Sequence, residues 1–215
     1  MMRFAAAAAA LLLVSISASA EPRHGISAFG DLKYPADFSH FDYVNPEAPK
    51  GGKMSTIGVV ARDTFDSFND FILKGDPAQG LGLLFDTLME RANDEPDAMY
   101  GLVARTADLA PDKKSITFQL REEAKFSDGS PVTAEDVCET FRLIMEYGHE
   151  RLRLPIKDAE RCEVLGPHEV RYLFKTGDNR DLPLHIAALP VLSKAYFAKA
   201  DFTKADLQPP LGSGP

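Results

Sequence analysis

Acidic residues and a threonine stand close together in the middle of the chain, in a pattern that could perform acid–base chemistry. Asp128 precedes Gly129, and Thr133, Glu135 and Asp136 follow shortly after. Paired carboxylates can act as a general acid and a general base. Local backbone structure accounts for the same residues without catalysis. Asp-Gly favours a tight turn, and Thr followed by acidic residues favours the first turn of a helix. We therefore interpret this cluster as structural.

The other reactive side chains form no recognisable catalytic or metal-binding motif. The histidines show neither i, i+4 pairing nor a His-Glu-x-x-His pattern, so we expect no metal site. The five histidines are His24, His40, His149, His168 and His185. The sequence also lacks Gly-x-Ser-x-Gly, phosphate-loop and Gly-x-Gly-x-x-Gly motifs. We therefore expect no enzymatic activity and no cofactor.

The first twenty residues have the features of a secretory signal peptide. Arg3 is followed by a mostly apolar run from Phe4 to Ile16 and by the small-residue site Ala18-Ser19-Ala20. The apolar run is shorter than the ~20 residues that a membrane-spanning helix needs. No cysteine at the cleavage site could carry a lipid. We therefore expect residues 1–20 to be removed and the protein to be soluble in the periplasm.

Cys138 and Cys162 are the two cysteines of this chain. An even number of cysteines in an exported chain favours pairing, and a bridge between these two would stabilise the fold by about 3 kcal/mol. Two buried free thiols that pack as small apolar groups are the alternative. We predict a disulfide with a structural role, because the sequence has no Cys-x-x-Cys redox motif.

The clearest secondary structure lies just before and after the turn at Asp128. Ile116, Phe118 and Leu120 alternate with polar residues, which is the period of a half-buried strand. After the turn, Thr133 can cap a helix whose apolar face carries the set Val137, Phe141 and Ile144 and which ends near Gly148.

Other segments give weaker signals. The spacing of the leucines and phenylalanine in Leu81–Leu88 predicts an amphipathic helix. The remaining expected elements are strands at 25–29 and 53–60, a turn at 93–96, a hairpin of strands at 162–165 and 170–174, a short helix at 183–189, an extended segment at 190–192 and a helix capped by Ser193. The net charge of −8 comes without a clustered basic face, so we expect no nucleic-acid partner.

The central stretch resembles the recurrent block of the family 5 extracellular solute-binding proteins, the peptide and nickel receptors of ABC importers. The block stands here as Leu120-Arg121, then KFSDG from Lys125, then TAEDV from Thr133. Further similar segments are HGISAFGDLKY from His24, PEAPKGG from Pro46, FDSFNDFILKG from Phe65, LGLLFDTLME from Leu81 and PPLGSGP from Pro209. They resemble the subgroup of microcin C and oligopeptide receptors.

The resemblance implies a mixed α/β (α+β) chain that forms the amino-terminal part of a periplasmic binding protein type II fold. Such receptors have two lobes that close on a ligand, and the first lobe carries an inserted small domain. We expect residues 21–61 to begin the first lobe, 62–188 to form the insert and 189–215 to return to the first lobe. The family's chains are much longer, so we expect a truncated fragment without the second lobe.

The resemblance also implies the substrate-binding component of an ABC importer for oligopeptides or peptide-like compounds. It would be a monomer that binds its ligand and delivers it to an inner-membrane permease. Two alternatives stay open. One is a non-binding remnant of a truncated or incompletely sequenced gene, and the other is a periplasmic hydrolase, for which no nucleophile is visible.

The segment after the second expected strand is the candidate ligand-binding surface, because the family meets the ligand backbone there. The candidate residues are Thr64, Phe65, Asp66, Ser67, Phe68 and Asn69. They mix aromatic rings with hydrogen-bonding groups, and Phe65 and Phe68 could form the walls of a side-chain pocket. Two phenylalanines at this spacing could equally belong to the core, and Asp66 could be a cap.

Overall fold

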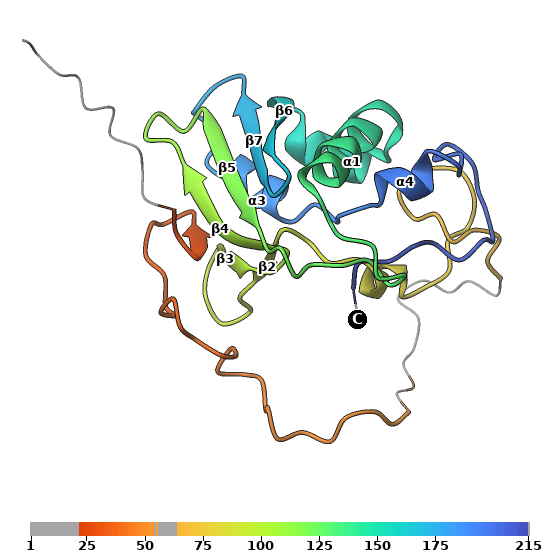
Figure 1. Ribbon diagram of the computed structural model, residues 1–215, viewed down its shortest axis with the longest axis horizontal. Helices are drawn as coiled ribbons and strands as arrows, with labels where there is room; N and C mark the ends of the chain where they lie inside the picture. Colours follow the sequence, from red (N-terminus) through yellow and green to blue (C-terminus); the bar gives the residue numbers. More distant parts are fainter. Residues whose placement is uncertain (1–21, 54, 56–63, 215) are drawn as a thin grey trace, which may run out of the picture.

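The computed structural model describes residues 22–53, 55 and 64–214 of the chain. The expected signal peptide and most of the expected strand at 53–60 lie outside the described residues. Two antiparallel sheets lie next to each other, and α1 lies against the larger sheet (Figure 1). The elements are β1 (Gly25–Ser27), η1 (Leu81–Leu84), β2 (Met89–Arg91), β3 (Ala98–Gly101), β4 (Ala104–Leu109), β5 (Ser115–Leu120), α1 (Ala134–Tyr147), α2 (Glu150–Arg153), η2 (Leu154–Ile156), β6 (Ala159–Gly166), β7 (Glu169–Phe174), α3 (Leu182–Ala187) and α4 (Lys194–Phe197).

The larger sheet has four strands in the order β4-β5-β7-β6. Ile116 pairs with Tyr172 and Phe118 with Val170, and all four side chains are buried. The predicted alternation in β5 is confirmed, as is the predicted β6–β7 hairpin. The apolar face of this sheet packs with α1 and α3 into the main core.

The smaller sheet has the order β1-β3-β2 and joins β1, near the start of the described chain, to β2 and β3. Gly25 of β1 pairs with Tyr100 of β3. A Cβ atom at Gly25 would lie 2.9 Å from the carbonyl oxygen of Met99, so a side chain there would force the two strands apart. The expected strand at 25–29 is present but shorter, and β4 is a strand that the sequence analysis did not assign.

The predicted turn and helix cap are both present. Ser130 donates to Asp128 Oδ1 through its backbone N–H (2.9 Å) and its hydroxyl (2.6 Å), and these bonds lower the pKa of Asp128. Gly129 adopts a φ of 85°, which glycine tolerates without strain. Thr133 donates to Asp136 Oδ2 through its N–H (2.9 Å) and hydroxyl (2.7 Å). The carboxylates of both motifs therefore accept hydrogen bonds from backbone N–H groups, which is a structural role.

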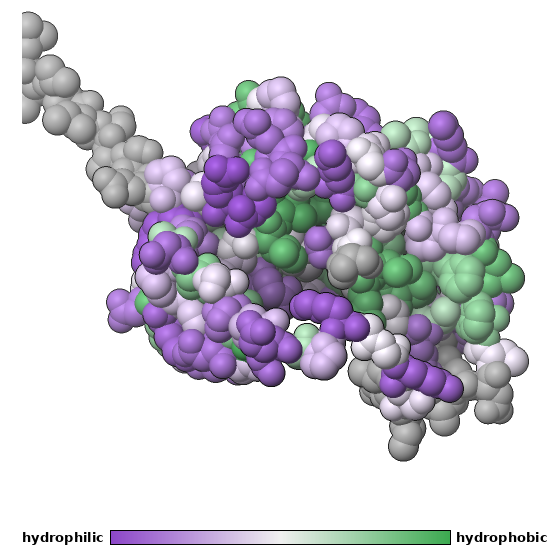
Figure 2. Space-filling view, turned by 60° about the horizontal axis from the view of Figure 1, so that its bottom comes forward, coloured by the Kyte–Doolittle hydropathy of each residue, from purple (hydrophilic) through white to green (hydrophobic). Residues whose placement is uncertain are grey.

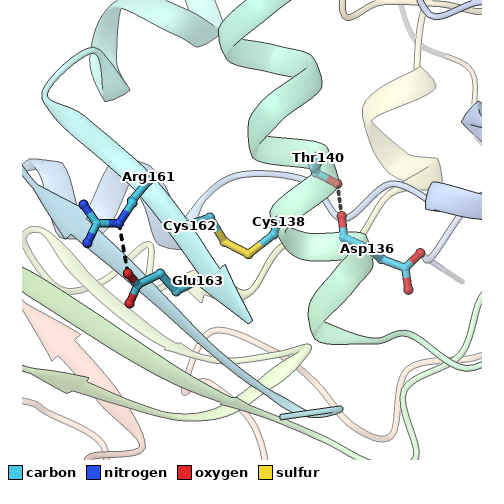
Figure 3. The surroundings of a disulfide bond; sticks show 6 residues. All are labelled: Asp136, Cys138, Thr140, Arg161, Cys162 and Glu163. Carbon is cyan, nitrogen blue, oxygen red and sulfur yellow. Dashed lines mark hydrogen bonds and ion pairs between the residues drawn. A yellow bond between two sulfur atoms is a disulfide. The ribbon is translucent and has the colours of Figure 1, made fainter. Parts of the chain in front are cut away.

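A disulfide joins α1 to β6, the edge strand of the larger sheet (Figure 3). The Cα atoms of Cys138 and Cys162 are 5.3 Å apart, within the ordinary range for a disulfide. Arg161 and Glu163 point away from the helix and form an ion pair at 2.9 Å. The pairing that the sequence favoured is thus the one that the structure contains, and it holds an outer strand to a helix.

The amphipathic helix predicted for Leu81–Leu88 is wrong. Only one 3-10 turn forms, and Phe85 is already extended (φ −126°, ψ 121°). The carbonyl of Leu84 accepts from the N–H groups of Ser213 (3.0 Å) and Gly214 (2.9 Å), so it bonds distant residues in place of the next turn of a helix. Tertiary pairing has overridden the helical pattern here.

Candidate functional site

The candidate segment 64–69 lies between two other segments of the chain. Ser67 forms a parallel bridge with Pro77. On the other side, the N–H of Phe68 donates to the carbonyl of Asp206 at 2.6 Å. The segment is therefore held by residues close to it in sequence and by residues far along the chain, and Figure 1 shows it on the same side of the molecule as α4.

Asn69 is the side chain that fixes this arrangement. Its Nδ2 donates to the carbonyls of Phe202 (2.8 Å) and Lys204 (3.2 Å), and its Oδ1 accepts from the N–H of Phe71 (3.1 Å). Ser67 Oγ accepts from the N–H of Asn69 at 2.9 Å. Both Ser67 and Asn69 are buried. Their polar groups are used inside the protein, where unpaired groups would be costly.

Asp66 caps the neighbouring turn. Its Oδ1 accepts from the N–H of Asp76 at 2.6 Å, and its own N–H donates to the carbonyl of Asp76 at 3.0 Å. Gly75 in this turn has a φ of 86°, and a Cβ there would lie 2.9 Å from Ala205. The turn can therefore lie this close to Ala205 only with glycine at position 75.

The two phenylalanines differ in their surroundings. Their ring centroids are 5.4 Å apart and tilted by 33°. Phe65 is 51% exposed, whereas Phe68 is half-buried beside Tyr196 and Phe197. Phe71, further along, belongs to the core, where its ring contacts Phe85 and Phe202. Of the six candidates, the structure leaves Thr64, Phe65 and Asp66 exposed and Phe68 partly so.

A hollow of about 530 Å³, lined by polar and apolar residues, lies close to this segment, between α4, the turn at Asp128 and residues 206–211. Its lining includes the side chains of Ser193, Tyr196, Lys199 and Gln208. Burial raises the pKa of Tyr196, and its hydroxyl donates to the carbonyl of Pro209 at 3.3 Å. Hydroxyl, amide and ammonium groups around one hollow can bind the backbone and polar groups of a small ligand.

Of the carboxylates near this hollow, Asp201 has the most strongly lowered pKa. Hydrogen bonds from Thr203 and Lys204 lower its pKa to about 2. The hydroxyl of Thr203 donates at 2.7 Å, and Lys204 Nζ lies 3.0 Å away. The carboxylate therefore stays charged and held in place at neutral pH, which suits a structural or electrostatic role better than proton transfer.

Apolar side chains are exposed on the same side of the molecule. Figure 2 shows green surface gathered on the right of the face that it presents, the side on which α4 and segment 64–80 lie in Figure 1. The exposed large apolar residues of these segments and their neighbours are Phe65, Leu73, Leu83, Leu84 and Leu207. Such a surface next to a hollow is typical of a region that contacts a ligand or another part of a protein.

The sequence analysis missed the hollow and the role of Asn69. Asn69 bonds Phe202, a residue 133 positions later, so nothing local in the sequence marks this contact. Among the described residues no group of three or more His, Cys, Asp and Glu side chains could hold a metal ion. A search of the same residues finds no helix with the length and apolar character to cross a bilayer.

Solved structures show which fold this chain shares. The periplasmic binding protein DppA from Helicobacter pylori, solved in complex with the peptide STSA, superposes with a TM-score of 0.56 at 19% sequence identity. The match covers 71% of this chain and 34% of that one. The fold is therefore that of a periplasmic binding protein, and the predicted mixed α/β class is confirmed.

Sequence comparison identifies the family. Residues 98–215 match the family described as bacterial extracellular solute-binding proteins, family 5 middle. The chain belongs to this family, as its motifs indicated.

Two curated relatives come from Agrobacterium fabrum. The "Peptidoglycan-binding protein YepA" is 42% identical over 95% of this chain. The "Probable peptide-binding protein YejA" is 38% identical over 98% of it. The chain spans 34% of the first relative and 35% of the second, about a third of their length.

Proposed function

We propose that this chain is the amino-terminal part of the substrate-binding component of an ABC importer for oligopeptides or peptide-like compounds. In this proposal residues 1–20 direct export to the periplasm. The mature protein captures its ligand between two lobes and delivers it to an inner-membrane permease. The division into residues 21–61, 62–188 and 189–215 is part of the same proposal, with residues 62–188 as the inserted small domain.

One observation carries the proposal. The chain is 38% identical, over 98% of its length, to a protein named for peptide binding. Identity at this level over the whole chain supports a shared ligand class as well as a shared fold. No sequence motif or cluster of described side chains supplies a catalytic nucleophile with its base, so a binding role explains the site with fewer assumptions than hydrolysis does.

The exposed part of segment 64–69 is the proposed contact with the ligand. Thr64 can exchange hydrogen bonds with a peptide backbone, a mode that gives affinity with little dependence on the ligand's sequence. Phe65 presents a large ring to solvent and can contact a side chain of the ligand. Ser67 and Asn69 then act indirectly, because they hold the segment against residues 202–206.

A second ligand class is favoured by a separate observation. The relative with 42% identity is named for peptidoglycan binding. Fragments of peptidoglycan carry short peptides, so they fall within the peptide-like compounds of the proposal. Their sugar portion and unusual amino acids distinguish them from ordinary oligopeptides in a binding assay.

A chimera tests the proposal. The region of Agrobacterium YepA that aligns with this chain is replaced by this chain, and binding of tripeptides, pentapeptides and peptidoglycan-derived peptides is measured by calorimetry. We expect the chimera to bind at least one class with a Kd near micromolar and the 215-residue chain alone to bind no peptide tighter than roughly 100 μM. In the chimera, Phe65→Ala should weaken binding about fivefold or more. Leu165→Ala, which alters an exposed side chain on β6 outside the candidate site, should not.

The possible failures are informative. A chimera that unfolds cooperatively, as a native protein does, yet binds none of the three classes would exclude the peptide-receptor proposal. Tight peptide binding by the 215-residue chain alone would show that a second lobe is not needed. Equal effects of Phe65→Ala and Leu165→Ala would remove segment 64–69 from the site.

A further inference from the structure

A separate cavity of about 410 Å³ is lined by residues of β1 and its neighbours. Figure 1 shows β1 on the opposite side of the molecule from segment 64–69. Three parts of the chain form it: residues 23–30, the β4–β5 hairpin and the turn before α3. Its volume falls within the range of ordinary small-molecule pockets, about 300–1,000 Å³. The proposed peptide function leaves this cavity without a role.

Contacts between the three parts hold the cavity together. Arg23 and Ala107 exchange two backbone hydrogen bonds of 2.9 Å, which join the start of the described chain to β4. The turn before α3 contacts the hairpin closely, since a Cβ at Gly177 would lie 2.3 Å from the carbonyl oxygen of Asp112. The walls are therefore fixed by backbone contacts between distant segments.

The charged residues that line the cavity are all basic. Its ionisable lining residues are Arg23, Lys113 and Arg180, and none of the described lining residues is acidic. This concentration of cations stands out in a chain whose net charge is −8. Asp181 pairs with Arg180 at 3.0 Å and partly offsets its positive charge. Among the described residues, neither Arg23 nor Lys113 has an ion-pair partner. Asp108, Asp112, Asp178 and Asp181 neighbour lining residues in the sequence but are not part of the lining. A lining that carries cations and no carboxylate attracts an anion.

The interior of the cavity is apolar. Ile26 and Pro183 are buried and line it, and Leu109 adds an aliphatic wall. At the rim, Phe29 is 61% exposed and lies under the guanidinium group of Arg180, 5.0 Å from ring centroid to Cζ. This contact holds an aromatic ring and a cation next to each other at the entrance.

We propose that this cavity binds a small organic anion with an apolar or aromatic body, of the class of arylalkyl carboxylates. The carboxylate lies between Arg23 and Lys113, where charge-assisted hydrogen bonds can form. The apolar body contacts Ile26 and Leu109 and stacks against Phe29. The proposal does not depend on the peptide function, because it involves none of residues 64–69.

The test uses 4-phenylbutyrate as the anionic probe and 4-phenylbutanol as its neutral analogue of similar size. Binding to the 215-residue chain is followed by amide chemical shifts in NMR. We expect saturable shifts at Ile26, Leu109 and Lys113, and at least a tenfold weaker Kd for the alcohol. Raising the salt concentration from about 20 to 200 mM should weaken the binding of phenylbutyrate several-fold, because salt screens exposed charges.

Variants separate the cavity from general surface binding. Arg23→Gln combined with Lys113→Gln should weaken phenylbutyrate binding tenfold or more, since it removes both unpaired cations. Lys125→Gln removes an exposed cation outside the cavity and should leave Kd unchanged. Phe29→Ala should weaken both probes by a similar factor, because the ring contacts the apolar body.

Three results would overturn the proposal. The alcohol could bind as tightly as the carboxylate, or the double variant could keep the native affinity with its fold intact. Shifts concentrated at Phe65, Leu83 and Leu207 would place the probe on the exposed apolar surface and not in the cavity.

Discussion

The Oδ1 atom of Asp136 accepts a hydrogen bond from the backbone N–H of Lys194 at 2.8 Å. The other oxygen of the same carboxylate holds Thr133 at the start of α1. Thr140, one turn later, accepts from the N–H of Leu192 at 2.9 Å. The first half of α1 therefore fixes the segment that leads into α4, the helix beside the 530 Å³ hollow of the candidate site. Asp136, which the sequence placed in the first turn of α1, therefore also positions the start of α4.

Asp136→Ala should destabilise the protein by about 2–4 kcal/mol. The substitution removes a helix cap and leaves the N–H groups of Thr133 and Lys194 without their partner. Urea unfolding followed by circular dichroism measures the change. Glu135→Ala is the matched control: it removes the exposed ion pair of Glu135 with Lys194 Nζ and should cost under about 1 kcal/mol. Similar losses for both variants would argue against the role of Asp136 in joining α1 to α4.

Loss of the disulfide should lower the free energy of unfolding by about 3 kcal/mol, because the bridge closes a loop with a sequence separation of 24 residues. The double variant Cys138→Ser, Cys162→Ser is compared with the oxidised protein by urea unfolding. Thiol alkylation under denaturing conditions checks the pairing directly. We expect labelling of both cysteines only after reduction, and labelling without reductant would show that the bridge is absent from the protein.

Acid should release the loop after β1 before the rest of the fold. Hydrogen bonds from Lys33 Nζ (2.6 Å) and the Tyr34 hydroxyl (2.5 Å) lower the pKa of Asp94. A lowered folded-state pKa stabilises the protein above the unfolded value of about 3.9, and this contribution is lost as the pH falls through the folded pKa. NMR signals of Tyr34 and Phe38 should therefore shift as the pH falls below about 3.9.

Asp94→Asn is the control for this effect. The amide keeps the size of the side chain but cannot ionise, so the Tyr34 signals should lose their acid-induced shift relative to signals from β5. An unchanged titration in Asp94→Asn would assign the effect to another carboxylate.

Asn69→Ala should destabilise the protein by about 1–3 kcal/mol. The amide makes three hydrogen bonds, and its removal leaves the carbonyls of Phe202 and Lys204 without that partner. Phe65→Ala, at an exposed position of the same segment, should change the unfolding free energy by under about 0.5 kcal/mol. The two variants thus separate the residue that holds the segment from the residue proposed to contact ligand. A large loss of stability in Phe65→Ala would place its ring in the core.

The sequence determined the parts of this fold that depend on near neighbours. The alternation in β5, the turn at Asp128 and the start of α1 at Thr133 all involve contacts within a few residues. The same stretch carries the motif that identified the family, and the family match covers it. Local hydrogen bonding and periodicity suffice for these features because both partners can be read in one window of the sequence.

The tertiary structure decided the features whose partners are distant. Leu84 follows a helical pattern, yet its carbonyl bonds residues 213 and 214, and the segment becomes extended. Asn69 bonds a carbonyl 133 positions away, and the cationic cavity gathers Arg23, Lys113 and Arg180 from three separate segments. No local pattern encodes such contacts. They exist only after the sheets and α1 have packed, because packing brings the distant donors, acceptors and charges to one place.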